Sequence, residues 1–345
     1  MEVLVEETDI ADKEPRGSHH ILTADGRFSS SWDPWRKPSF ASLLKFLFMR
    51  SEDSVPDSVS LEKTLPIIKA DVSQFDKSPD SGIRHMWIGH ATSLVQFDGV
   101  TLLTDPIFSN RCSPFQWLGT KRYRPPPLTI DQLPKIDCVL ISHNHYDHLD
   151  INSVKALNER YGESLTWYVP LGLKQWMNDS GCSNVIELQW WQEHLHSPES
   201  QVKMVCTPCQ HWCKRTLNDD NKVLWSSWCV LGPKHNFYFA GDTGYCNVFK
   251  EIGKKYGPFT LSTIPIGAYS PRWFLKHHHV DPSEAVDIHI DVKSKKSIGI
   301  HWGTFVLSKE FYLEPREKLK EELEKRGMTL SSFITVRHGD VLVTD

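Results

Sequence analysis

The fold and the chemistry of this chain depend on the stretch Ser142-His143-Asn144-His145-Tyr146-Asp147-His148-Leu149-Asp150. It follows the apolar run 136–141, which is short and β-branched and therefore typical of a buried strand. Because side chains alternate along an extended backbone, His143 and His145 point the same way, whereas the adjacent Asp147 and His148 diverge. One loop can therefore serve two neighbouring divalent ions, such as the pairs about 3.5–4 Å apart that some hydrolases use. A merely polar loop is the less favoured alternative.

Length and charge limit what this chain can be. Its 345 residues allow one large domain or two modest ones with a sizeable core. The net charge is −4 and no basic stripe stands out, so a nucleic acid is not expected as a partner. The acidic residues 1–10 lack the features of a secretory signal, and no apolar run approaches the roughly 20 residues of a spanning helix. We therefore expect an intracellular protein that is not secreted and that contacts membranes only at their surface.

The eight cysteines fit reduced, buried thiols better than a disulfide scaffold, which is usually shorter and denser in cysteine. One run of the sequence resembles half of a zinc ribbon: Cys206-Thr207-Pro208-Cys209-Gln210-His211-Trp212-Cys213. Because no second ligand pair stands at matching spacing, ordinary buried cysteines are favoured over a thiolate metal site.

The N-terminal part divides into two regions ahead of the main domain, which is expected over residues 82–345. Residues 1–30 are acidic and lack a hydrophobic period, so they are expected to form a disordered tail. In residues 31–81, apolar side chains from Phe40 to Phe48 recur at helical spacing, and a connector rich in Ser, Asp, Pro and Lys follows. This amphipathic helix either packs on the main domain or dips into a lipid surface, and the sequence leaves both alternatives open.

Strands and helices alternate from residue 82 onward. Residues 85–97 and 100–105 are expected to form a two-stranded hairpin about an Asp-Gly turn. The periodicity predicts further strands at 136–141, 165–170, 185–188, 202–208, 226–231, 236–240, 261–267 and 296–303, and helices at 151–161, 171–178 and 283–291. This succession favours an α/β fold with βαβ packing. The long loop 111–127, rich in proline and aromatic residues, is expected to cover a site.

Three more residues suited to metal binding stand where expected strands end: His211, Asp242 and His301. Glycines on both sides of Asp242 let the backbone turn sharply, so that two ions could share its carboxylate. Together with the 143–148 loop, these positions supply five imidazoles and two carboxylates. Asp105, at the end of another expected strand, either accepts a hydrogen bond from a ligand histidine or caps a turn.

These residues resemble the pattern of the metallo-β-lactamase superfamily, His-x-His-x-Asp-His followed by a histidine, an aspartate and a histidine at successive strand ends. Longer segments resemble one family within it, the N-acyl-phosphatidylethanolamine-hydrolysing phospholipase D family. They are Ile141 to Asp150, Gln210 to Cys213, Phe239 to Tyr245, Ile264 to Tyr269, Pro271 to Phe274 and Ile300 to Thr304. The similarity runs from about residue 32 to the C-terminus.

The resemblance implies an αβ/βα four-layer sandwich, two zinc ions, peripheral association with membranes and a homodimer. It implies the following ligands: His143, His145 and His211 for one ion, Asp147, His148 and His301 for the other, and Asp242 as a bridge. The implied activity is that of a zinc-dependent phosphodiesterase of the phospholipase D type, which converts N-acylphosphatidylethanolamine into N-acylethanolamine and phosphatidic acid. Iron or manganese also suits such ligands. A second interpretation keeps the metal site but assigns a soluble substrate, as in a lactonase or another phosphodiesterase.

Contacts with the substrate are hypotheses at this stage. Asp147 and His279 are expected to be catalytic, with His279 near the leaving oxygen. Tyr146, Arg215 and His279 are expected to bind the substrate. Arg215 either forks onto the phosphate or is an exposed surface arginine.

Further side chains near these positions have competing interpretations. His277 and His278 are expected to be solvated loop residues. Four tryptophans either grip acyl chains or belong to the core, and core packing is favoured for most of them: Trp117, Trp190, Trp191 and Trp273.

Overall fold

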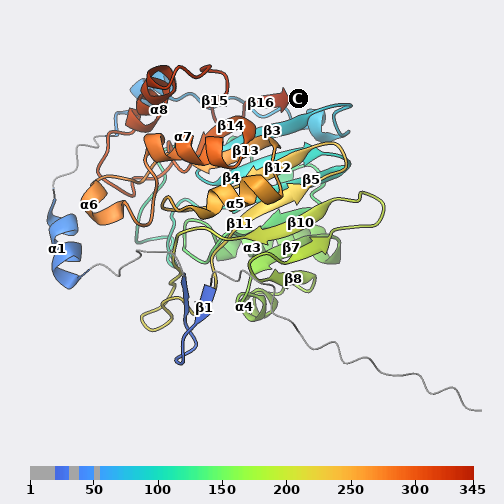
Figure 1. The fold of residues 1–345 in the computed structure, drawn as a ribbon, viewed down its shortest axis with the longest axis horizontal. Helices are drawn as coiled ribbons and strands as arrows, with labels where there is room; N and C mark the ends of the chain where they lie inside the picture. Colours follow the sequence, from blue (N-terminus) through green and yellow to red (C-terminus); the bar gives the residue numbers. More distant parts are fainter. Residues whose placement is uncertain (1–19, 31–38, 50–54) are drawn as a thin grey trace, which may run out of the picture.

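The computed structural model describes residues 20–30, 39–49 and 55–345, and two seven-stranded sheets form its centre (Figure 1). The first sheet consists of β3 (Ile83–Gly89), β4 (Thr92–Phe97), β5 (Val100–Thr104), β6 (Cys138–Leu140), β7 (Thr166–Pro170), β8 (Val185–Leu188) and β16 (Val341–Thr344). The second consists of β9 (Glu193–Leu195), β10 (Lys203–Thr207), β11 (Ser227–Leu231), β12 (Asn236–Phe239), β13 (Phe259–Pro265), β14 (Ser294–Ile300) and β15 (Phe333–Ile334). Their strand orders are β16-β3-β4-β5-β6-β7-β8 and β15-β14-β13-β12-β11-β10-β9.

The α-helices of the described chain are α1 (Phe40–Phe48), α2 (Ser58–Thr64), α3 (Ile151–Tyr161), α4 (Lys174–Asp179), α5 (Val248–Lys255), α6 (Arg272–Leu275), α7 (Pro282–Asp291) and α8 (Glu314–Lys325). Short 3-10 turns occur at Val72–Phe75, Ile130–Gln132 and Gly162–Ser164. Within the described residues, no helix is both long enough and apolar enough to cross a membrane.

Side chains of the first sheet alternate between two layers, as extended backbone dictates. Val95 and its inward-facing neighbours share a core with the second sheet, whereas Leu94 and its outward-facing neighbours pack against α3 and α4. Helices α5, α7 and α8 bury their apolar sides in the core of the second sheet, and α5 and α7 lie across that sheet in Figure 1. The layers therefore run helix, sheet, sheet, helix, which confirms the expected αβ/βα four-layer sandwich.

The strand directions bring six strand ends to matching edges of the two sheets. In the first sheet β3 and β5 are each antiparallel to β4, and β5 is parallel to β6, so all three point the same way. In the second sheet β10 and β12 are each antiparallel to β11, and β12, β13 and β14 are parallel. The carboxyl ends of β3, β5, β6, β10, β12 and β14 can therefore carry one shared site.

The region expected as a single strand at 85–97 is two strands, β3 and β4, so the expected two-stranded hairpin is in fact three strands. His90 and Ala91 form the turn, and His90 has a φ of +52°. Two bonds hold the turn: Trp87 Nε1 donates to the His90 carbonyl (2.9 Å), and Thr104 Oγ1 donates to that of Ala91 (2.7 Å). Gly89 and His90 interrupt the apolar residues of this region, which is the turn signal that the single expected strand overlooked.

The N-terminal segments are more ordered than the sequence predicts. Residues 20–30 were expected in a disordered tail, yet they form the hairpin of β1 (His20–Leu22) and β2 (Phe28–Ser30). Arg27 of this hairpin donates to the backbone carbonyls of Asn218 and Asp220. The expected helix is present as α1, whereas α2 lies within the expected connector and is capped by Asp57. Residues 1–19, 31–38 and 50–54 lie outside the described residues, and the domain boundaries stay predictions.

Two buried histidines of the sheet and helix layers predict acid sensitivity. Burial lowers the pKa of His85 to about 3 and that of His289 to about 4, so both are neutral in the folded protein. The unfolded chain binds protons at these positions below about pH 6.5. Their contribution to stability is therefore complete above pH 6.5 and is lost as the pH falls towards 3 to 4.

We predict that His289→Asn, which keeps a polar partner for Ser297 Oγ at the position of Nδ1, weakens this dependence. Below pH 6 the free energy of unfolding of the wild type should fall more steeply than that of the variant, by up to about 1.4 kcal/mol per pH unit. Urea titrations between pH 5 and 8 measure both slopes. Parallel curves over the whole range would contradict the prediction.

Candidate metal centre

Three imidazoles converge at the ends of β6 and β10. His143 Nε2 lies 2.8 Å from His145 Nδ1, and His211 Nε2 lies 3.3 Å from the same nitrogen. Burial lowers the pKa of His143 and of His211 well below the ordinary value and that of His145 to about 4. All three rings are therefore neutral at pH 7, which is the form of histidine that binds a metal ion.

A second group gathers around the carboxylate of Asp147. Its Oδ2 lies 3.3 Å from His148 Nε2 and 3.5 Å from His301 Nε2. His90, from the turn after β3, joins this group with its Nε2 2.9 Å from the same oxygen. The ligand atoms of these four residues lie within 4.8 Å of one another. His90 is a residue that the sequence analysis missed.

Asp242, at the end of β12, lies between the two groups. Its Oδ2 lies 3.1 Å from His148 Nε2 and 3.0 Å from His301 Nε2, and 3.9 Å from His211 Nε2 in the first group. Gly241 has a φ of +61°, and a Cβ there would lie 2.7 Å from Ser142 Cβ. This close approach requires glycine beside Asp242, and the carboxylate stands where both groups can share it.

Asp105 accepts hydrogen bonds that orient the loop 142–150. Accepting a hydrogen bond from a ligand histidine is one of the two roles that the sequence left open for this residue. Its Oδ2 accepts a hydrogen bond from His148 Nδ1 (2.6 Å), and its Oδ1 accepts one from the Ser142 amide (2.7 Å). The Ser142 hydroxyl also donates to Asp105 and accepts from His143 Nδ1 (2.8 Å). With Nδ1 of both rings engaged in this way, Nε2 of His143 and of His148 faces the cluster.

His211 is oriented by a different segment, the loop ahead of α7. Its Nδ1 donates to the His278 carbonyl (3.0 Å), which leaves Nε2 facing His145 and Asp242. His278 was expected to be solvated, but its side chain is only 5% exposed. The next residue, His279, has Nδ1 3.8 Å from Asp242 Oδ2.

The charges of this cluster favour a cation. Burial acts to raise the pKa of Asp147 and of Asp242, but the charge on His148 together with hydrogen bonds from His148 and His301 holds both pKa values well below the ordinary range. Conversely, burial acts to lower the pKa of His301, but Asp242 and Asp147 raise it to about 9. The two carboxylates thus draw positive charge towards them, which protons or divalent cations can supply.

Buried polar atoms without hydrogen-bond partners support the same conclusion. They are His145 Nε2, His148 Nε2, Asp242 Oδ1, His279 Nδ1 and both ring nitrogens of His301. Such atoms are costly to bury unless something pairs with them. Imidazole nitrogens and carboxylate oxygens are ligands of zinc, iron and manganese, so the residues present fit a metal centre.

A cavity of about 640 Å³ opens onto the cluster. Its polar end includes His145, Asp147, Asp242 and His279, and its apolar wall comes mainly from α1, α6 and the 301–310 loop through Leu43, Phe274, Leu275 and Leu307. Cys112 and Thr120 line it as well, so the expected covering loop 111–127 does border the site.

The comparisons with known proteins agree with this geometry. The family model of the beta-lactamase superfamily domain matches residues 101–302. N-acyl-phosphatidylethanolamine-hydrolyzing phospholipase D 1 of Caenorhabditis elegans is 43% identical over 316 residues, which make up 88% of each chain. This chain belongs to the N-acyl-phosphatidylethanolamine-hydrolysing phospholipase D family. The mitochondrial family member of Saccharomyces cerevisiae is 36% identical over 299 residues, 85% of this chain but only 63% of the yeast protein.

A solved structure shares the fold at greater distance. Igni18, a metallo hydrolase from Ignicoccus hospitalis, superposes with a TM-score of 0.57 at 18% identity, over 77% of this chain and 99% of its own. At that identity the likeness shows the fold alone. Family membership therefore rests on the sequence relatives, and the metal centre rests on the residues described above.

Two residues expected to bind substrate in this family member contact each other. Tyr146 lines the cavity, and its hydroxyl donates to the Arg215 carbonyl (2.8 Å). The Arg215 guanidinium lies 4.1 Å from the Tyr146 ring and donates to the carbonyls of Asn144 (2.9 Å) and Leu149 (2.8 Å). Arg215 is half-buried and is not among the residues that line the cavity. Its bonds hold the loop 142–150, so it is not the exposed surface arginine that the sequence left as an alternative. Its contact with phosphate stays a prediction.

The tryptophans divide between the core and the surface. Trp190 is fully buried and Trp191 packs against the core, in agreement with the core packing that the sequence analysis favoured. Trp117 and Trp273 are 74% and 47% exposed. The cysteines expected to be buried thiols are buried at 206, 209 and 213, and no disulfide joins any of the eight cysteines, all of which are described.

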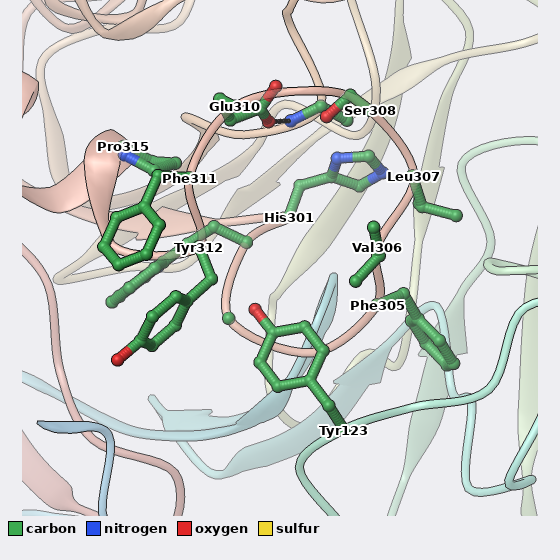
Figure 2. A pocket seen from close by; sticks show the side chains of 13 residues that line it. Tyr123, His301, Phe305, Val306, Leu307, Ser308, Glu310, Phe311, Tyr312 and Pro315 are labelled. Carbon is green, nitrogen blue, oxygen red and sulfur yellow. Dashed lines mark hydrogen bonds between the residues drawn. The ribbon is translucent and has the colours of Figure 1, made fainter. Parts of the chain in front are cut away.

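A much smaller cavity, of about 20 Å³, lies behind His301 (Figure 2). Glu310 lies at its upper edge in Figure 2 and accepts hydrogen bonds from the amides of Ala268 (2.6 Å) and Ser270 (3.0 Å). Since these amides begin the segment that leads into α6, Glu310 fixes one wall of the larger cavity. The space itself is too small for a substrate.

We predict that Asp105→Asn lowers metal affinity about 10- to 100-fold, because an amide nitrogen cannot accept the bond from His148 Nδ1. Metal content after dialysis and zinc titration measure the loss. Asp98→Asn is the matched control, since Asp98 also accepts from a histidine Nδ1, that of His235 (3.0 Å), at a turn between strands. Equal metal content in both variants would contradict the role of Asp105.

Proposed function

We propose that this protein is a dinuclear metal phosphodiesterase of the phospholipase D type, which hydrolyses N-acylphosphatidylethanolamine to N-acylethanolamine and phosphatidic acid. The observation that carries the proposal is a cluster of imidazoles and carboxylates at the polar end of a cavity whose other wall is apolar. Such a cavity suits a substrate that joins a charged phosphodiester to acyl chains. The Caenorhabditis elegans relative, 43% identical, carries the name of this activity.

The proposed cofactors are two zinc ions. One would be held by His143, His145 and His211, and the other by Asp147, His148 and His301, with Asp242 shared. Divalent ions at this place would polarise the phosphoryl oxygens and lower the pKa of a water molecule towards neutrality.

Two residues of the cavity are proposed to act on the substrate directly. Asp147 borders the cavity from the loop after β6, with 16% of its side chain exposed. His279 lines the cavity and has a buried Nδ1 without a hydrogen-bond partner. It is therefore placed to form a hydrogen bond with the leaving oxygen of the N-acylethanolamine.

We predict that Asp147→Asn abolishes release of fatty-acyl ethanolamide from phospholipid vesicles, because zinc takes the carboxylate oxygen of Asp as a ligand and the amide lacks its charge. Metal analysis and the cleavage assay are run on the same samples. Asp179→Asn, an exposed position on α4, should behave as the wild type. If the wild type holds metal but cleaves a soluble lactone or nucleotide ester instead of the phospholipid, the second interpretation, a soluble substrate, is correct.

We propose that the protein associates with membranes through the face that carries α1 and α6. On α1, Leu44 is 37% exposed and Phe48 is 86% exposed. The two helices contact each other: Phe46 stacks on Phe274 with ring centroids 4.6 Å apart, and Lys45 Nζ lies 4.6 Å from the Trp273 ring centroid. Exposed apolar and basic side chains at the wall of the cavity suit a phospholipid surface. An intracellular location and a homodimer stay predictions.

Phe48→Asp should weaken binding to phospholipid vesicles by about tenfold or more, because burial of a phenylalanine side chain is worth about 1.5–3 kcal/mol. Vesicle sedimentation measures binding, and hydrolysis of a short-chain substrate without vesicles should be unchanged. Val59→Asp on α2, also exposed at 64%, is the control. Equal vesicle binding by both variants would contradict the proposed face.

A further inference from the structure

The turn between β3 and β4 places at the metal centre a polar side chain that is not among the seven expected ligands. His90 is 1% exposed, and its Nε2 lies 2.9 Å from Asp147 Oδ2. An ionised carboxylate can only accept hydrogen bonds, so the ring nitrogen is the donor. We propose that His90 positions the Asp147 carboxylate for metal binding, an inference that rests on the metal centre of the proposed function.

Asp147 needs such a partner more than the other residues of its group. Its side chain is 16% exposed, whereas those of His148 and His301 are 0% and that of Asp242 is 2% exposed. It also stands in a loop and borders the cavity, so packing alone does not fix its rotamer. A charge-assisted hydrogen bond from a buried donor holds one oxygen in place.

Hydrogen bonds to the backbone of His90 fix the position of its ring, which is the donor to Asp147. The His90 carbonyl accepts from the His301 amide (2.9 Å), and the His90 amide donates to Thr304 Oγ1 (2.8 Å). The ring lies 4.1 Å from that of His301 between centroids. The turn therefore joins the end of β14, in the second sheet, to Asp147, which follows β6 in the first sheet.

This arrangement couples two halves of one metal site. Asp147 and His301 come from different sheets, and a small shift of one sheet against the other would separate them. His90 holds both: its ring holds Asp147, and its backbone holds His301. His90 is thus a positioning residue, because it acts through Asp147 and His301.

The test compares two substitutions of His90 that differ in side-chain length. His90→Asn accepts the left-handed backbone at φ +52° but is too short to donate to Asp147. His90→Gln can place its Nε2 near the position of the histidine Nε2. We expect His90→Asn to lower the affinity for one of the two zinc ions about 10- to 100-fold, with kcat reduced and KM little changed, and His90→Gln to recover most of both losses.

The matched control is His85→Gln, since His85 is fully buried on the same strand and its Nε2 contacts Ser93 Oγ (3.0 Å). It should keep both ions and full activity. Zinc titration with metal analysis gives the affinity, and thermal melts of the metal-free proteins show whether each variant is folded. If His90→Asn does not fold, His90→Gly, which also accepts a positive φ and has no side-chain donor, replaces it in the same zinc titrations with the same expected loss.

Two results would overturn the proposal. A folded His90→Asn that binds both ions as the wild type does removes the positioning role. A His90→Gln as defective as His90→Asn shows that the imidazole does more than donate one hydrogen bond. Failure of the proposed function is seen separately, because a wild type that binds zinc but leaves N-acylphosphatidylethanolamine intact contradicts the substrate, while the zinc titrations still decide the role of His90.

Discussion

Two carboxylates set among imidazoles are the constraint on which this structure depends. Asp147 and Asp242 stand within 3.5 Å of ring nitrogens of His148 and His301, in a place where unpaired charge costs several kcal/mol. The sandwich satisfies the constraint by ending β6 and β14, from different sheets, at the same edge. Protons or a divalent cation can supply the positive charge that the cluster favours.

Local sequence was sufficient for the parts of the site that strands deliver directly. The 142–150 stretch, Asp242 and His301 each follow a strand with a clear apolar pattern, and the structure brings them together. The helix expected at 151–161 is α3 to the residue. These features are predictable because the pattern that forms the strand also sets where its last side chain points.

Features that depend on contacts distant in sequence were missed. His90 lies in a turn that distant residues hold: its amide donates to Thr304 Oγ1, and its carbonyl accepts from the His301 amide. In the sequence Arg215 has no evident partner, yet its guanidinium donates hydrogen bonds to the carbonyls of Asn144 and Leu149. Helix α8 is rich in charge, so its three buried residues gave only a weak period. The same limit applies to the substrate, since one fold serves many reactions and the cavity wall depends on α1 and α6.

The direct measurement of the central claim is a crystal structure with anomalous diffraction recorded on both sides of the zinc absorption edge. The account predicts two anomalous peaks, one among His143, His145 and His211 and one among Asp147, His148 and His301, with Asp242 touching both. A fully folded protein without anomalous density between these residues, after growth and crystallisation with zinc, would contradict it.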